Sequence, residues 1–296
     1  MSNPWPAFDL QSHSLYSDGE LPVAGVIERA ARAAVELLAL TDHDTVEGVS
    51  EALTAARAHG IALLPATEIS AVDGAYEDLH LLGYGISHND RSLRERLEGA
   101  RADREARAGR MTRKLEELGF AVDQTPLQAR LDAGKLLGRP HLSSAVLAHP
   151  ANAARLAEEG HDDVASFLPA YLIPGAPAYS GRTEPTMGEA ITWIHDAGGV
   201  AVWAHPFWDI NSPQEVLDSI DRFVALGVDG VECFYVTHDA PQTQLLADRC
   251  EELGLLTTGS SDFHGPSHRL FSRFLVHELH GRQPNLGVLG DAVAVV

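Results

Sequence analysis

The sequence predicts an α/β fold in which the strands of a parallel sheet alternate with helices that cover it. Short apolar runs are typical of buried strands, and the stretches between them have the spacing of amphipathic helices. Periodicity alone does not decide whether such a sheet closes into a barrel or stays open and doubly wound. After a first strand that runs into Gln11-Ser12-His13, we expect strands at 36–41, 61–66, 79–84, 200–205, 230–234 and 255–260, and helices at 22–34, 46–59, 187–197, 213–226 and 240–253.

The ends of several expected helices carry residues that favour a start or a stop. Pro22 and Pro213 stand at helix starts, where the backbone N–H that proline lacks would have no partner. Gly60 and Gly254 stand just beyond helix ends, where glycine is favoured. These signals support the helix boundaries given above.

The alternation of strands and helices is lost between roughly 91 and 185. The segment 91–118 is rich in charged residues and strong helix formers, and it has few large apolar side chains. A second helical stretch with Pro and Gly follows it. We therefore expect one domain from 1–90 and 186–296, and a mostly helical insertion at 91–185 that packs as a cap over one end of it.

The charge of the chain limits its partners. Lys and Arg number 22 against 42 Asp and Glu, which gives a formal net charge of −20. Such a surface repels polyanions, so we expect neither duplex nucleic acid nor an anionic membrane as a partner. A small phosphorylated substrate can still bind where cations in a cleft reverse the field locally.

Other features predict a cytoplasmic protein, present as a monomer or a small homo-oligomer. Only two cysteines, Cys233 and Cys250, are present, which is typical of a reducing compartment. The opening residues MSNPWPAF have neither the basic start nor the apolar run of a signal peptide. No apolar stretch is long enough to span a membrane.

Histidines and carboxylates gather at the ends of the expected strands. In a parallel α/β fold the carboxyl ends of the strands converge on one face, and that face holds the functional site. A single histidine at a strand end is more often a hydrogen-bonded core or surface residue, but this set comes from at least five strands. Its members are Gln11, His13, Asp18, Asp42, His43, Glu68, His80, His205, Asp262 and His264.

This mixture of side chains predicts a site for divalent metal ions. Residues two apart on a strand point the same way, so Gln11 with His13, and Asp262 with His264, can chelate as pairs. Imidazole mixed with carboxylate suits Zn, Mn or Fe(II) better than Ca, which prefers oxygen ligands alone, and Mg is a further candidate. The lack of a thiolate cluster argues against a structural zinc site.

The same residues carry a resemblance to a known family. The chain contains, in this order, DLQSHSLYSDGE, LLALTDHDTVEG, LLPATEIS, LHLLGYG, AVWAHP and GSSDFHG. This series resembles the polymerase-and-histidinol-phosphatase (PHP) family. The family pattern opens with D-L-H-x-H and S-D-G, and continues with T-D-H-D, a strand-end Glu, a His, A-H-P and S-D-x-H. The resemblance spans nearly all of the chain outside the insertion.

The resemblance implies a distorted (β/α)7 barrel with a site for two or three divalent ions. It implies a supporting role for Asp42, which orients a ligand or a metal-bound water. By position, it implies that the ligands are His13, Asp18, His43, Glu68, His80, His205, Asp262 and His264.

Gln11 stands where the family pattern has its first histidine. An amide oxygen can still coordinate, but it is a poorer ligand for Zn than imidazole, so one ion would be held weakly, exchanged or absent. The other interpretation, an inactive enzyme, is disfavoured because every other expected ligand is present.

The insertion carries candidates for binding the substrate. Gly138-Arg139-Pro140-His141 resembles a segment that grips phosphate in the small-nucleotide phosphatase branch of the family. Arg139 offers a fork of donors that matches phosphate oxygens, and His141 offers a further donor. The alternative for Arg139 is an ion pair at the surface. Arg182 is a weaker candidate for the same role.

The sequence thus predicts a metal-dependent phosphoesterase in which His205 or His238 protonates the leaving alkoxide. The resemblance implies removal of phosphate from a nucleoside monophosphate or a 3′,5′-bisphosphate. Trimming of short oligonucleotides from the 5′ end is a near alternative, and the insertion disfavours histidinol phosphate. A non-catalytic metal or nucleotide sensor is the alternative from another class, because of Gln11.

Overall fold

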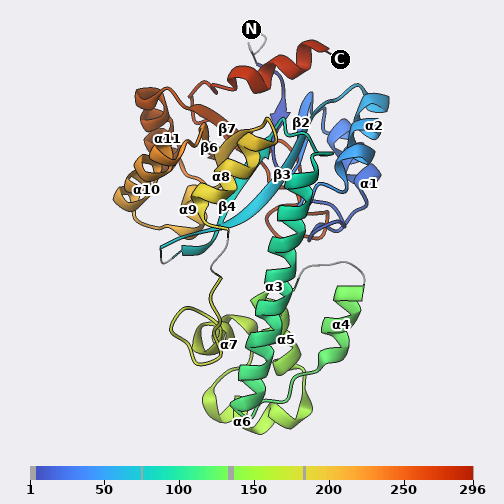
Figure 1. Ribbon diagram of the computed structural model, residues 1–296, viewed down its shortest axis with the longest axis vertical. Coiled ribbons are helices and arrows are strands. Elements are labelled where there is room, and N and C mark those ends of the chain that lie inside the picture. The colour runs from blue at the N-terminus through green and yellow to red at the C-terminus, as the bar shows by residue number, and fades with distance from the viewer. Residues whose placement is uncertain (1–4, 75, 133–136, 183–184, 296) are drawn as a thin grey trace. The chain divides into compact units, whose positions relative to one another are not determined.

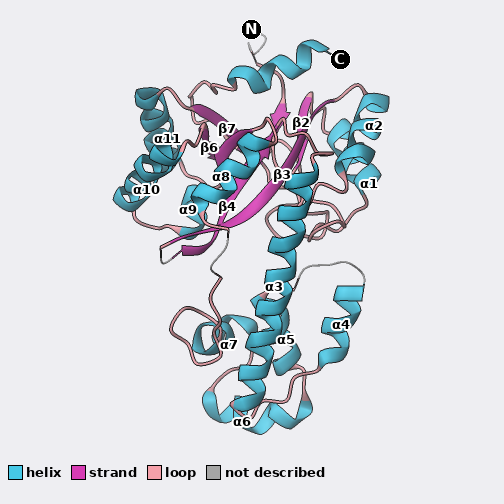
Figure 2. Ribbon diagram, in the orientation of Figure 1, coloured by secondary structure: helices cyan, strands magenta, loops and turns pink. Residues whose placement is uncertain are grey.

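The computed structural model describes residues 5–74, 76–132, 137–182 and 185–295. The chain divides into two compact units, Met1–Glu98 with Glu184–Val296, and Gly99–Thr183. The first unit contains all of the strands described here, and the second is helical (Figures 1 and 2). Each unit has an apolar core of its own.

The first unit is built on a seven-stranded sheet in which the strands lie in chain order. The strands are β1 (Phe8–Asp9), β2 (Leu37–Leu40), β3 (Ala62–Asp73), β4 (Tyr76–Tyr84), β5 (Val200–Trp203), β6 (Gly230–Tyr235) and β7 (Leu256–Ser260). The helices around them are α1 (Val23–Arg32), α2 (Val49–His59), α8 (Met187–Asp196), α9 (Pro206–Asp209), α10 (Pro213–Leu226), α11 (Ala240–Leu253) and the 3-10 helix η2 (Gly287–Val295).

The sheet is mixed, so the prediction of an entirely parallel sheet was wrong. β4 runs antiparallel to both β3 and β5, whereas the other neighbouring strands pair in parallel. Only two residues separate Asp73 from Tyr76, and so short a connection cannot hold the crossover helix that parallel strands need. β3 also continues well beyond the predicted end at residue 66.

The sheet nearly closes on itself, because the chain after β1 pairs with the end of β7 and with the chain that follows it. Leu10 N donates to Gly259 O at 3.1 Å, and His13 N donates to Phe263 O at 2.8 Å. The buried carboxylate of Asp9 strengthens this seam, since it accepts hydrogen bonds from the backbone N–H groups of Ser261 and Leu275. The structure is therefore a distorted, nearly closed seven-stranded barrel, which confirms the fold class.

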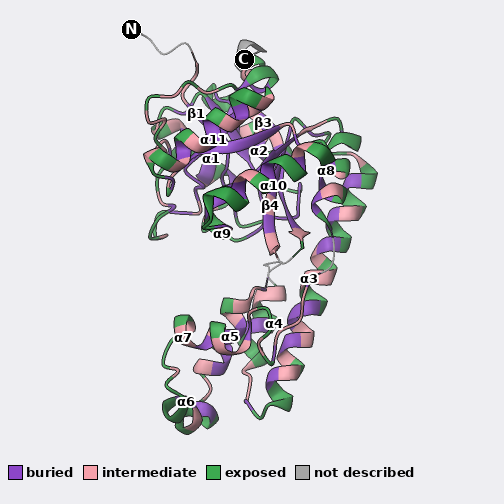
Figure 3. Cartoon of the chain, turned by 90° about the vertical axis from the view of Figure 1, so that its left-hand side faces the viewer, coloured by how far each residue is buried: buried purple, intermediate pink, exposed green. Residues whose placement is uncertain are grey.

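The helices bury the outer faces of the strands. α1 and α2 pack against each other and α2 against β3, while α8, α10 and α11 follow one another along the side of β4 to β7 (Figure 1). The strands are buried along most of their length, and the helices expose only their outer faces (Figure 3). Gly83 permits the close approach of α8, because a Cβ at this position would lie 2.8 Å from Ile194 Cγ1.

The second unit is a small helical domain with its own apolar core. Its elements are α3 (Arg91–Glu117), which begins in the first unit, α4 (Gln124–Asp132), α5 (Arg139–Leu147), η1 (Pro150–Asn152), α6 (Ala153–Glu159) and α7 (Val164–Tyr171). Phe120, Phe167 and Tyr171 pack ring against ring in this core. The guanidinium of Arg155 lies 3.8 Å from the ring centre of Phe120, which adds a cation–π contact. The predicted role of this unit as a cap stays a prediction.

Among the described residues, no helix combines the length and apolar character needed to cross a membrane.

We predict that Gly259→Ala destabilises the barrel by about 1–3 kcal/mol, because overpacking a tight site forces the backbone to move. The added Cβ would lie 2.5 Å from both the carbonyl oxygen and the Cβ of Phe234 on the neighbouring strand. Gly99→Ala on α3 is the matched control, since only the helix's own backbone lies within 4 Å of its new Cβ. It should stabilise the helix by about 0.5–1 kcal/mol. Urea unfolding measures both, and equal midpoints for Gly259→Ala and wild type would contradict the prediction.

Candidate metal centre

Eight of the predicted ligands lie close together at one edge of the barrel. We call this set the candidate metal centre: His13, Asp18, His43, Glu68, His80, His205, Asp262 and His264. Most of them follow the carboxyl ends of β1, β2, β5 and β7. His80 is different because β4 runs the opposite way, and it lies inside that strand opposite Ser70 of β3. The reversed strand therefore still supplies a side chain to the same edge.

Glu68, on β3, is fully buried and is approached from several directions. Its Oε1 lies 2.7 Å from His80 Nδ1 and 3.3 Å from His205 Nε2. Its Oε2 lies 3.1 Å from His13 Nε2 and 3.7 Å from His43 Nδ1. Imidazoles from four separate parts of the sheet thus converge on one carboxylate.

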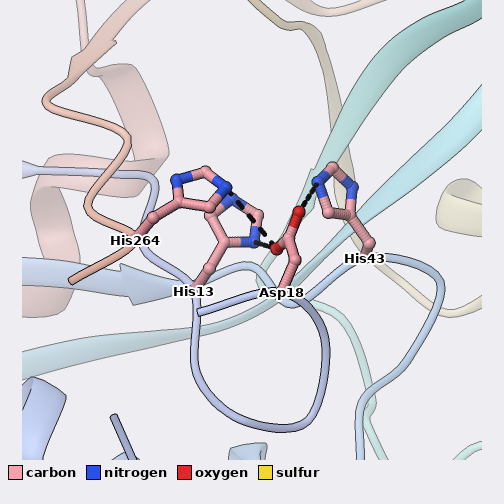
Figure 4. Close-up of side chains that lie close together, drawn as sticks. All are labelled: His13, Asp18, His43 and His264. Carbon is pink, nitrogen blue, oxygen red and sulfur yellow. Dashed lines mark ion pairs between the residues drawn. The ribbon is translucent and has the colours of Figure 1, made fainter. Parts of the chain in front are cut away.

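Asp18 forms a second point of convergence, in the loop between β1 and α1 (Figure 4). Its Oδ1 lies 3.6 Å from His13 Nδ1 and 3.5 Å from His264 Nε2, and its Oδ2 lies 3.5 Å from His43 Nε2. The ring of His13 stacks on both other imidazoles, with ring centres 4.7 Å from His43 and 4.3 Å from His264. Burial lowers the pKa of His43 to about 4, so this ring is neutral at pH 7, the form that binds metals. Burial also opposes protonation of His13, but Asp262 and Glu68 outweigh it and raise the pKa of His13 above its usual range.

Asp262 completes the set on the side of β7. Its Oδ1 lies 3.1 Å from His13 Nε2 and 3.5 Å from His264 Nδ1, while its Oδ2 accepts a hydrogen bond from the hydroxyl of Tyr235 at 2.8 Å. The hydroxyl of Tyr235 therefore fixes Oδ2, while Oδ1 faces the two histidines.

The donor atoms fall into three overlapping groups, and within each group they lie within 4.8 Å of one another. The groups share His13, His43 and Glu68, so they form one compact centre rather than three separate sites. Their members are His13, Asp18, His43 and His264; His43, Glu68 and His80; and His13, Glu68 and Asp262.

Several buried atoms of this centre have no hydrogen-bond partner among the described residues. They are His13 Nε2, His43 Nδ1, His205 Nδ1 and Asp262 Oδ1. Although charged neighbours lie near some of them, these contacts lack either the distance or the direction of a hydrogen bond. A buried polar atom without a partner costs about 1–3 kcal/mol, and a divalent cation would satisfy such lone pairs. The residues therefore fit metal ions with nitrogen and oxygen ligands.

The carboxylates of the centre are ionised at neutral pH. Burial alone would raise the pKa of Glu68, but His43 and His80 outweigh it and hold the pKa well below its usual range. Burial is likewise outweighed at Asp262, where His264 and His13 lower the pKa to about 2. The centre thus offers negatively charged oxygen ligands without needing a high pH.

The backbone is strained at three positions beside these ligands. Asp44, His205 and Asp262 have φ values of 52°, 29° and 51°, in a region that residues other than glycine seldom occupy. His205 is held there by a hydrogen bond from its N–H to Glu232 Oε2 at 2.9 Å, and Asp44 by one from Ser70 N to its Oδ1 at 2.9 Å. Strain that the surrounding structure sustains in this way is typical of functional sites.

Comparison with known proteins agrees with this geometry. The model of the PHP domain family matches residues 9–124. A 3′,5′-nucleoside bisphosphate phosphatase of Chromobacterium violaceum is 34% identical over 259 residues, which cover 87% of each chain. The chain belongs to the PHP family.

Two further matches cover most of the PHP chain. A 5′-3′ exoribonuclease of Haemophilus influenzae is 32% identical over 88% of this chain and 90% of that protein. A solved structure of an amidohydrolase from Chromobacterium violaceum, with bound sulfate and no metal, is 31% identical, has a TM-score of 0.73 and covers 90% of both chains. Together with the buried donor groups, these relatives identify the protein as a hydrolase, a metal-dependent PHP phosphoesterase.

Gln11, which departs from the PHP pattern, is buried between Glu68 and Ser260. Its Nε2 donates to Glu68 Oε2 at 2.8 Å, and its Oε1 lies 3.3 Å from Ser260 Oγ, whose single proton is shared with Glu232. An ionised carboxylate only accepts, so the amide nitrogen must be the atom that faces Glu68. The amide oxygen, which would have to coordinate a metal, faces Ser260 instead. Coordination by Gln11 stays a prediction.

Glu232 lies behind this pair and was missed by the sequence analysis. It is fully buried, and it accepts hydrogen bonds from Ser260 Oγ at 2.6 Å and from His205 N at 2.9 Å. Burial raises the pKa of Glu232 to about 8. The signal that could have revealed it is a carboxylate inside the apolar run GVECF. Tyr235 was also missed, because only the fold brings its hydroxyl to Asp262.

Asp42 lies beside the centre and holds the loop that carries Asp18. Its Oδ1 accepts hydrogen bonds from Ser14 N at 2.7 Å and Ser17 Oγ at 2.6 Å, and its Oδ2 accepts one from Ser14 Oγ at 2.7 Å. Both oxygens are therefore committed to the residues between His13 and Asp18. The predicted contribution of Asp42 to catalysis, by orienting a ligand or a metal-bound water, stays a prediction, and these contacts favour it.

His238, the other predicted proton donor, is buried in a more apolar setting. Its Nδ1 lies 3.1 Å from the carbonyl oxygen of Cys233, so the ring proton is on Nδ1 and Nε2 is a bare acceptor. Its ring lies against those of Phe207 and Tyr235. Burial lowers the pKa of His238 to about 4, so the ring is neutral at pH 7.

The remaining predicted residues lie in the helical unit. Arg139 is the first residue of α5, and His141 accepts a hydrogen bond from Gly138 N through its Nδ1 at 3.0 Å, which caps that helix. Arg182 is buried near the end of the unit. Their binding of substrate stays a prediction.

We predict that Glu68→Gln lowers the metal content by more than half, because Glu68 belongs to two of the three donor groups. The amide keeps the shape of the side chain but removes the negative charge. Glu51→Gln, on the exposed face of α2, should bind as much metal as wild type. Elemental analysis after dialysis against Mn measures this, and unchanged content in Glu68→Gln would refute the shared role of the carboxylate.

We predict that Gln11→His binds Zn about 10- to 100-fold more tightly than wild type and gains least for Mg, because imidazole is the better ligand for borderline metals. Titration of each metal into chelator-stripped protein measures the affinities. Gln214→His on the exposed face of α10 should leave them unchanged. Equal affinities in Gln11→His and wild type would mean that residue 11 does not reach the ion.

Proposed function

We propose that the protein hydrolyses a phosphomonoester of a small nucleotide, either a nucleoside monophosphate or a 3′,5′-bisphosphate. The observation that carries this proposal is the compact centre of buried imidazoles and carboxylates at one edge of the barrel. A PHP relative is named for the 3′,5′-bisphosphate reaction, and the similarity to it covers 87% of the chain.

The charge of the loaded centre suits a phosphate dianion. Three divalent ions held by Asp18, Glu68 and Asp262 would leave a local charge of about +3 before solvent is counted. The chain as a whole carries a formal charge of −20, which disfavours long polyanions. A small phosphate ester therefore fits better than duplex nucleic acid.

Bound ions would lower the pKa of a coordinated water and stabilise the attacking and leaving oxygens. The chain's own residues hold the centre: Glu68 is fixed by four imidazoles, and Asp262 by Tyr235. Asp42 fixes the loop of Asp18 through two serines. Preorganised ligands of this kind need little rearrangement during the reaction.

The two predicted proton donors, His205 and His238, differ in their protonation state in the free protein. Burial opposes protonation of His205, but Glu68 outweighs it and raises the pKa of His205 to about 9. His238, with a pKa of about 4, carries no second proton at pH 7. His238 is therefore better suited to accept a hydrogen bond at Nε2 than to protonate a leaving alkoxide. His205 can be the proton donor only through a ring nitrogen that holds no metal ion.

Trimming of short oligonucleotides from the 5′ end is the second candidate function. It is favoured by the 32% identity to the 5′-3′ exoribonuclease of Haemophilus influenzae, which covers most of both chains. The same phosphate-binding centre would serve both reactions.

We predict metal-dependent release of phosphate from nucleoside monophosphates and 3′,5′-bisphosphates, and none from chelator-stripped protein. The assay presents these esters, short 5′-phosphorylated oligonucleotides and histidinol phosphate, each with Mn, Fe(II), Zn or Mg. Phosphate and nucleotide release are measured separately, because an exonuclease liberates mononucleotides. Tight binding of nucleotides without turnover under any metal would overturn the proposal and support a sensor.

A further inference from the structure

Three aromatic side chains form a surface beside the metal centre, which we call the aromatic shelf: Trp208, Tyr235 and Phe271. The ring centre of Trp208 lies 5.6 Å from that of Phe271 and 6.4 Å from that of Tyr235. Tyr235 and Phe271 are themselves 6.1 Å apart and nearly fully buried. Trp208, on α9 (Figure 1), is therefore the outer member of the shelf.

The shelf is joined directly to the candidate metal ligands. The hydroxyl of Tyr235 donates to Asp262, and the ring of Phe271 lies 5.4 Å from that of His264. Trp208 N donates to the carbonyl oxygen of His205 at 2.8 Å, one turn of chain after that ligand. A ligand held by the metal centre would thus have the shelf next to it.

Trp208 is 49% exposed, although it packs on two buried rings. The other tryptophans, Trp5, Trp193 and Trp203, are buried or half-buried. Other exposed apolar side chains also lie in loops that carry metal ligands, namely Leu15 and Tyr16 after β1 and Leu270 after β7. Exposed apolar side chains in the loops that carry a polar site are typical of a ligand-binding surface.

The loop beneath the shelf is held in place before any ligand binds. His264 N donates to Phe271 O at 2.9 Å, and Phe271 N donates to His268 Nδ1 at 3.0 Å. The ring of His268 stacks on Phe271 with centres 4.8 Å apart. Glu20 accepts hydrogen bonds from the backbone and hydroxyl of Ser267. A shelf fixed in this way loses little conformational freedom on binding.

We propose that the aromatic shelf binds the nucleobase of the substrate by stacking on Trp208 while the metal centre holds the phosphate. This inference rests on the proposed function. Every base has a π face, so stacking tolerates any base, and we expect little preference among the four common bases. The shelf would therefore separate nucleotides from other phosphate esters rather than one nucleotide from another.

The test compares Trp208→Ala and Trp208→Phe with wild type, using loaded enzyme. Adenosine 5′-monophosphate has a base, and ribose 5-phosphate is the same ester without one. We expect Trp208→Ala to lower the ratio of kcat/KM for the nucleotide to that for the sugar phosphate by about tenfold, mainly through KM. Trp208→Phe keeps an aromatic face and should hold the ratio within about threefold of wild type. Leu226→Ala, which truncates an exposed apolar side chain at the end of α10, is the matched control.

A binding measurement tests the same contact without turnover. A non-hydrolysable phosphonate analogue of the nucleotide should quench tryptophan fluorescence in wild type. The quenching should disappear in Trp208→Phe even though this variant still binds the analogue by calorimetry. Quenching that persists in Trp208→Phe would place the base elsewhere and overturn the proposal.

The kinetic outcomes separate this proposal from the proposed function. Equal loss of activity on both esters in Trp208→Ala, or no change in their ratio, would refute the base subsite while leaving the phosphatase intact. Failure of wild type to hydrolyse either ester or a nucleoside 3′,5′-bisphosphate with any metal would instead refute the proposed function.

Discussion

The structure of the site depends on the burial of one carboxylate, Glu68, among four imidazoles. An ionised carboxylate away from water is costly unless charge and hydrogen bonds compensate for it. Here the compensation comes from residues after β1, β2 and β5 and within β4, so the ligands can meet only when the barrel is formed. Folding and assembly of the metal centre are thus one event.

The seam between β1 and β7 joins the two ends of the strand order, and so it brings residues from both ends of the sheet close to this carboxylate. β1 is only two residues long, and its continuation pairs through Ser12 with Phe263. Asp9 ties this seam to the chain beyond β7. The pairing brings His13 and Asp262 together from opposite ends of the barrel's strand order, which an open sheet would hold apart.

Residues outside the predicted set of metal ligands hold several of the ligands in place. Asp42, Glu232 and Tyr235 orient the Asp18 loop, the His205 backbone and Asp262. Tyr235 also belongs to the aromatic shelf, so the residue that orients the metal ligand Asp262 is also part of the proposed base subsite. Such supporting contacts fix ligand geometry and tune metal affinity in metalloproteins generally.

The sequence by itself determined the strand–helix alternation, the helical insertion pattern and the residue types at the strand ends. These follow from local periodicity and from short motifs such as T-D-H-D and S-D-F-H. Only the tertiary structure decided that β4 runs antiparallel, that the barrel nearly closes, and that Gln11 turns its amide nitrogen to Glu68. It also brought Glu232, Tyr235 and Trp208 to the site. Strand direction, barrel closure and side-chain partners depend on contacts between residues far apart in the chain, and such contacts cannot be predicted from local sequence patterns.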